Sequence, residues 1–196
     1  MRFFRASLAA LFLLLQSGRP IEANELFPPA PTDEVSVRMI PTFSVIQTDL
    51  TSSLNSGWSK GFRLGARYAA LSHSGLNTPT ILTFPDWDKN PTAEGDHVHL
   101  QVQCLLDPLP NLPKVHDPGA SLEQMPAMTV ACCAHSGAYS PAHFMACLKK
   151  IQDHLQAQHI PAIGPPRYLY YSNTSWYPSM WRVGEVQVPI AAGGRH

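Results

Sequence analysis

Hydrophobic and polar residues alternate with two different periods along the chain, and together the two periods predict strands and helices. Apolar and polar positions alternate one by one over residues 97–105 and 183–190, which is the pattern of half-buried strands. After Ser140 and Pro141, a typical start for a helix, apolar residues recur at steps of three and four as far as His159. The pattern therefore predicts an α+β domain.

The order strand, helix, strand, strand occurs twice, in residues 35–106 and again in residues 122–191. The predicted elements are a strand within 35–48, a helix over 58–74, strands over 80–84 and 97–105, a strand from residue 128, a helix over 141–159, and strands over 167–171 and 183–190. One such unit alone leaves a sheet edge and an incomplete core exposed. We therefore expect a tandem repeat paired about a pseudo-twofold axis, with a cleft between the repeats.

The first 23 residues have the features of a secretory signal peptide. A basic start is followed by an apolar run over 6–15, and small residues precede a possible cleavage site. The run is too short to span a bilayer, which needs about 20 residues. We expect a secreted or periplasmic protein with no membrane span after cleavage.

Three further segments lack periodicity. They are a proline-rich leader over residues 24–34, which we expect to be mobile, a linker over 107–121 and a tail over 192–196. The domain itself is expected over residues 35–191.

Charge and cysteine content narrow the classes of function. Charged residues make up 14% of the chain and are formally balanced, which argues against nucleic acid as a partner. Four cysteines allow disulfides if the protein is exported. A bridge between Cys132 and Cys147 and a set of four buried thiols, including Cys104 and Cys133, both remain open.

Three short motifs carry a resemblance to a known family. The sequences HSGAY (135–139), IPAIGPPRYLYY (160–171) and GEVQVPI (184–190), in this order and spacing, resemble the GyrI-like small-molecule-binding domain. That domain is also the effector-binding module of many bacterial multidrug-responsive regulators, and its fold is similar to that of the SOUL haem-binding proteins. The resemblance implies two repeats that form one antiparallel sheet with two helices, and an aromatic-lined pocket between the repeats.

The resemblance also implies site residues. Glu185 matches the acidic residue of the final strand that often meets cationic ligands, and Tyr139 matches the tyrosine that follows the first strand. The tyrosine of the strand that forms the third element of the unit, over 167–171, is either Tyr170 or Tyr171. Alternation along 183–190 places Glu185 on the side opposite Val186, so that a site on its side would hold a carboxylate among aromatic rings.

Other candidates come from the residues alone. Trp176 and Trp181 lie in a loop that offers little to bury them, which makes them candidates for a pocket wall. His99 is the counterpart of Glu185 in the first unit. His97 and His99 point the same way, but two ligands do not make a metal site, and we expect no metal.

The expected function is an exported, stand-alone domain that binds an apolar, aromatic or cationic small molecule. The chain lacks the helix-turn-helix segment of the regulators. Three alternatives remain open: binding of haem, a structural or protein-partner role, and ring-opening hydrolysis with Glu185 as acid or base beside Tyr170. Apart from haem in the first alternative, no cofactor is expected. Enzymatic activity is therefore uncertain, and the oligomeric state is left open.

Overall fold

The computed structural model describes residues 26–53, 76–87, 98–106, 119–171 and 178–191, with scattered residues between 56 and 67. The predicted signal peptide, the tail and most of the first predicted helix lie outside these residues. No helix among the described residues is both long and apolar enough to cross a bilayer.

One antiparallel sheet of eight strands forms the domain, which confirms the predicted α+β class. The strands are β1 (Val35–Ile40), β2 (Phe43–Ser52), β3 (Leu76–Thr83), β4 (Val98–Leu106), β5 (Ser121–Met125), β6 (Met128–Ser136), β7 (Arg167–Tyr170) and β8 (Val183–Ile190). Helix α3 (Pro141–Ala157) follows β6, and a short 3-10 helix, η1 (Ser179–Trp181), precedes β8. A second helical segment lies between residues 56 and 67.

The strand order across the sheet is β1-β6-β8-β7-β3-β4-β2-β5. This order is symmetric. If β1 is exchanged with β5, β2 with β6, β3 with β7 and β4 with β8, the same order is obtained when read from the opposite edge of the sheet. The two halves meet where β3 pairs with β7, and Ile81 lies opposite Leu169 there.

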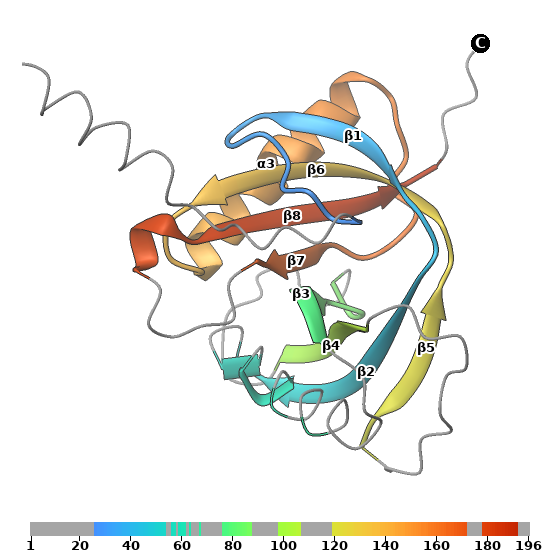
Figure 1. Ribbon diagram of the computed structural model, residues 1–196. Helices are drawn as coiled ribbons and strands as arrows, with labels where there is room; N and C mark the ends of the chain where they lie inside the picture. The colour runs from blue at the N-terminus through green and yellow to red at the C-terminus, as the bar shows by residue number, and fades with distance from the viewer. Residues whose placement is uncertain are drawn as a thin grey trace, which may run out of the picture.

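Two pairs of strands connect the halves. A single strand was predicted over 35–48, but the structure divides it into β1 and β2 at Pro41, since proline cannot donate to a strand ladder. Strands β5 and β6 are interrupted in the same way at Pro126. Because β1 pairs with β6 and the first half of β2 pairs with β5, the two divided strands run alongside each other on both sides of their prolines. Figure 1 shows the strands β1 and β2, with the strand β5 beside β2.

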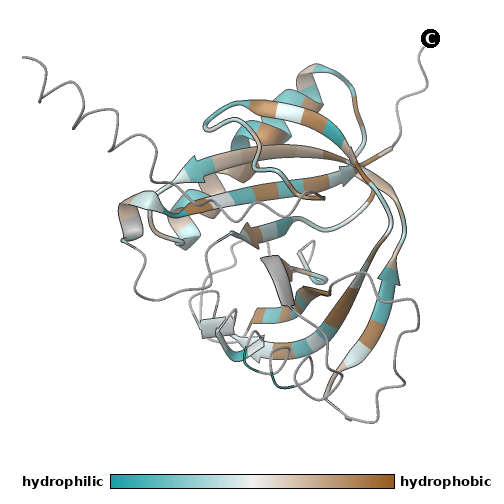
Figure 2. Cartoon of the chain, viewed as in Figure 1, coloured by the Kyte–Doolittle hydropathy of each residue, from teal (hydrophilic) through white to brown (hydrophobic). Residues whose placement is uncertain are grey.

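The two faces of the sheet carry separate cores. On one face, helix α3 packs Phe144, Ile151 and Leu155 against the strands. Ser140 caps this helix by accepting a hydrogen bond from the His143 N–H (3.2 Å). The opposite face has its own apolar cluster, whose buried members are Phe27, Ile40, Phe43, Val45, Ile81, Leu105, Val130, Leu169 and Tyr171. Figure 2 shows the resulting bands of apolar and polar residues along β2, β5 and β8.

The segment before β1, residues 26–33, closes this second face, and we call it the N-terminal strap. Figure 1 shows it crossing in front of β6 and β8, with α3 on the far side of the sheet. Phe27 is fully buried and packs edge-to-face against Phe43, with ring centroids 5.0 Å apart. Asp33 donates its N–H to the Ala134 carbonyl (2.8 Å) and pairs with Lys150 of α3. The sequence predicted a mobile leader, whereas the structure packs this segment onto the sheet because Phe27 supplies an apolar anchor.

The cysteines are four buried thiols. Cys132 faces the strap side of the sheet and contacts the Ser36 hydroxyl (3.3 Å). Cys133, one residue later, faces α3, where it shares the core with Cys147, and the interaction with the Cys147 thiol lowers the pKa of Cys133. Of the two alternatives left open by the sequence, the structure shows the four buried thiols and not the bridge between Cys132 and Cys147, because Cys132 lies on the strap side of β6 and Cys147 lies on the opposite side, in α3.

Candidate functional site

Alternation along β8 places Glu185 on the strap side of the sheet. Val186 and Val188 belong to the core beneath α3, so Glu185 and Gln187 point the other way. The Glu185 side chain is 0% exposed. A fully buried carboxylate is costly unless hydrogen bonds and an opposite charge compensate it, so its partners define the site.

Four donors surround the Glu185 carboxylate. Arg38 of β1 forms an ion pair with Oε1 through its Nη2. The Gln187 side-chain amide donates to the same oxygen (2.7 Å). The other oxygen, Oε2, accepts from the Ala30 backbone N–H (2.7 Å) and from the Tyr171 hydroxyl (3.1 Å). Both oxygens therefore have hydrogen-bond partners, and these include an arginine, an amide and a backbone N–H as well as an aromatic residue.

The N-terminal strap covers this network and supplies two of its hydrogen-bonding groups. Its Ala30 N–H reaches Glu185, and its Pro28 carbonyl accepts a hydrogen bond from Arg38 Nη1. The Arg38 side chain is 19% exposed, so the ion pair meets solvent only at the edge of the strap. In this arrangement the strap covers Glu185, and a molecule that binds to Glu185 would have to displace the strap.

A second arginine lies deeper on the same face. Arg167, the first residue of β7, is 3% exposed and donates from Nη2 to the Gln187 side-chain carbonyl (2.5 Å). Gln187 in turn donates to Glu185, so it links the two charged groups. Burial lowers the pKa of Arg167 to about 10, because the charged guanidinium is separated from water.

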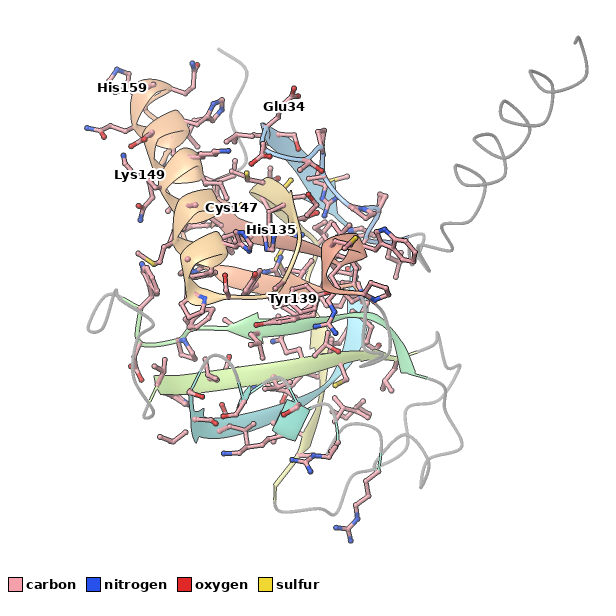
Figure 3. The ribbon with its side chains drawn as sticks, turned by 90° about the vertical axis from the view of Figure 1, so that its left-hand side faces the viewer. Glu34, His135, Tyr139, Cys147, Lys149 and His159 are labelled. Carbon is pink, nitrogen blue, oxygen red and sulfur yellow. The ribbon has the colours of Figure 1, made fainter. Side chains whose placement is uncertain are left out.

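Two of the aromatic residues that the sequence grouped with Glu185, Tyr139 and Tyr170, lie on the other face. Tyr170 is 1% exposed, and its ring packs against Tyr139 with centroids 4.3 Å apart. Tyr170 belongs to the core beneath α3, and Tyr139 packs against that core. Figure 3 shows Tyr139 on that side of the sheet. Tyr171, one residue later, is the tyrosine that reaches Glu185. The sheet thus separates the expected aromatic wall from the acid.

A buried histidine completes the aromatic cluster. His135 Nε2 lies 2.6 Å from the Tyr168 hydroxyl, and the His135 ring stacks on that of His143. Burial lowers the pKa of His135 to about 4 and raises that of Tyr168. A Cβ at Gly184 would collide with the His135 ring, which explains why the GEVQVPI motif carries a glycine there.

The other predicted site residues lie apart from this network. His99 is exposed and contacts Asp86 (2.9 Å); it lies on β4, which β3 and β7 separate from the strand of Glu185, β8. Trp181 lies in η1 and is 51% exposed. Trp176 lies outside the described residues. Within the described residues no group of three His, Cys, Asp or Glu side chains is placed to hold a metal ion.

Sequence reasoning missed Arg38, Arg167 and the strap. The alternation of the strand over 167–171 carries a usable signal, because Arg167, Leu169 and Tyr171 must share a face. Arg38 has no such signal, since it is 147 residues from Glu185.

Comparison with solved structures places this fold among known ones. The C-terminal domain of EcmrR superposes with a TM-score of 0.62 over 81% of this chain and 97% of that domain, at 13% identity. A hydrolase from Listeria innocua superposes with a TM-score of 0.62 over 83% and 94%, at 10% identity. SAV2435 bound to tetraphenylphosphonium superposes with a TM-score of 0.51 over 81% and 94%, at 11% identity. No family model and no curated protein matches the sequence.

These matches define the class of the domain by its fold, a one-sheet α+β domain shared with EcmrR, the Listeria innocua hydrolase and SAV2435. The fold is that of the GyrI-like effector-binding domains, and the resemblance noted in the sequence is confirmed at this level.

Proposed function

We propose that this protein is a small-molecule-binding domain whose site is the face of β7 and β8 that carries Glu185 and Tyr171, beneath the N-terminal strap. The observation that carries the proposal is the buried polar network around Glu185, which is covered by a short segment rather than by a strand or helix. Support also comes from SAV2435, which has this fold and was solved with tetraphenylphosphonium bound.

Binding in this site is a competition with the strap. Phe27 fills the apolar part of the face, where it contacts Phe43, and burial of such a side chain stabilises by about 1.5–3 kcal/mol. A ligand with an aromatic or other apolar body replaces Phe27 and recovers this energy. The apparent affinity is the intrinsic affinity multiplied by the fraction of molecules in which the strap is open.

The wider arrangement of the domain belongs to the same proposal. The symmetric strand order supports two copies of one unit, β1 to β4 and β5 to β8, with the binding face where the two copies meet. Residues 1–23 act as a signal peptide, and the mature domain is secreted or periplasmic. Peptide sequencing of the exported protein tests this part, and an intact N-terminus would refute it.

The experiment that tests binding uses the neutral fluorescent probe N-phenyl-1-naphthylamine. We expect saturable fluorescence enhancement with the native protein, and tighter binding by Phe27→Ala, because that change removes the strap's anchor. Val37→Ala, at an exposed position of β1, is the matched control and leaves the affinity unchanged. If Phe27→Ala binds no more tightly than the native protein, the strap does not cover the site.

A hydrolytic role is the second candidate. It is favoured by the contact of the Tyr171 hydroxyl with Glu185 (3.1 Å), which places a hydroxyl donor beside a carboxylate. Tyr170, the tyrosine expected to take part, lies on the other face. Hydrolysis predicts ligand consumption that Glu185→Gln abolishes; a ligand recovered intact after prolonged incubation with native protein contradicts it.

A further inference from the structure

Arg167 has hydrogen-bonding capacity that its surroundings do not use. Among the residues that the structure describes, its Nη2 alone has a partner, the Gln187 side chain (2.5 Å). Its Nε and Nη1 have no hydrogen-bond partner among the described residues, although the side chain is 3% exposed. Buried donors are nearly always satisfied in proteins, because an unmet donor loses its hydrogen bonds to water.

A second unpartnered polar group lies next to it. Thr83 of β3 is opposite Arg167 in the strand register, so both side chains project from the same face. The Thr83 hydroxyl is buried and has no partner within the described part of the chain. Gln101 of β4 lies opposite Thr83 and is half-buried, so this row of polar residues leads outward from Arg167.

The charges of the buried layer do not balance. Arg38 and Arg167 both act on Glu185, and they repel each other, which contributes to the lowered pKa of Arg167. Glu185 is the only carboxylate among the described residues buried in this layer, and Arg38 is its direct partner. The face therefore carries one positive charge in excess, and an uncompensated buried charge is strongly unfavourable.

We propose that the binding site takes a ligand that carries a carboxylate or a similar oxyanion, held by Arg167 and Thr83 beside an apolar body. An oxyanion supplies acceptors for the free N–H groups and the hydroxyl, and it neutralises the excess charge. A cationic ligand supplies no acceptor for these groups and adds to the excess positive charge, and Glu185 is already paired with Arg38. This inference rests on the proposed function and specifies the chemistry of its ligand.

Three probes of nearly identical shape test the charge preference: 2-naphthoate, 2-naphthamide and 2-naphthamidine, which are anionic, neutral and cationic. Dissociation constants are measured by calorimetry with the full chain. We expect 2-naphthoate to bind roughly 10- to 100-fold more tightly than 2-naphthamide, the range of a charge-assisted hydrogen bond. The preference disappears in Arg167→Met. It remains in Lys149→Met, which removes an exposed positive charge of α3.

Thr83→Val provides an independent variant if Arg167→Met does not fold, and it weakens 2-naphthoate binding without changing the affinity for 2-naphthamide. Binding of 2-naphthamidine as tightly as 2-naphthoate would overturn the anion preference and leave the small-molecule site intact. A preference for 2-naphthoate that persists in Arg167→Met would also overturn it. Failure of all three probes to bind would reject this inference and the proposed site together.

Discussion

Replacement of Glu185 by glutamine is the most direct test of the buried network. The change keeps the size of the side chain and removes its charge. Arg38 and Arg167 then repel each other without the carboxylate that compensates them. In addition, one carboxylate oxygen becomes an amide NH₂ group, which is a donor. Groups that donate to that oxygen in the native protein, such as the Ala30 N–H, would then face another donor.

The expected cost follows from these losses. Removal of one partner from a buried ion pair destabilises a protein by about 3–5 kcal/mol, because the other charge stays buried and unpaired. Since Glu185 is fully buried and accepts from four donors, we expect Glu185→Gln to fall within this range. That is a large part of the roughly 5–15 kcal/mol by which native domains are stable.

Urea unfolding followed by circular dichroism measures this loss. Glu123→Gln, at an exposed position of β5, is the matched control and should change stability by less than about 0.5 kcal/mol. The double variant Arg38→Met/Glu185→Gln should lose less than the sum of the two single losses, because the two residues are direct partners. A loss below about 1 kcal/mol for Glu185→Gln would refute the view that the ion pair is buried and intact.

Three other predictions concern the strap, the histidine and the thiols. Ala30→Pro removes one backbone donor from the buried carboxylate and should cost about 1–2 kcal/mol in urea unfolding; an unchanged midpoint contradicts the strap contact. The folded-state pKa of His135, about 4, lies below its value of about 6.5 in the unfolded chain, so the unfolded state binds more protons between these values. Stability is therefore complete above pH 6.5 and falls by about 1–2 kcal/mol as the pH drops towards 4, allowing for screening by solvent, and His135→Gln should flatten that slope. Mild oxidation with diamide should join Cys133 to Cys147, and peptide mapping that finds Cys132 in the bridge would contradict the assignment of faces.

The second half of the fold was largely predictable from the sequence. Strand β8 has the predicted bounds, and α3 ends two residues before the predicted end. Both elements have strong periodicity, and the helix has a capping serine followed by proline, so local chemistry alone determines them. Strand β5 was missed, because SLEQM has no apolar alternation and is held only by its pairing with β2.

The site was predictable only in part, because its partners depend on register. Alternation places Glu185 on a face, but it does not say which tyrosine of the preceding strand shares that face. The register places Leu169 opposite Glu185, so Tyr171 rather than Tyr170 lies on the same side. A shift by one residue would exchange the two tyrosines. The strap and Arg38 depend on contacts across more than 140 residues, which no local pattern encodes.

The separation of the two faces determines where ligand chemistry belongs in this domain. On the α3 face, Tyr168 and Tyr170 are at most 1% exposed and their rings pack against each other and against Tyr139, so the cluster acts as core. On the strap side, buried charges are held by a short segment anchored chiefly through Phe27. Displacing that segment costs far less than separating α3 from the sheet, because it exposes one large apolar side chain instead of a whole helix face. The proposed site therefore lies on the strap side, where a ligand would meet Glu185 and Arg167 rather than an aromatic wall.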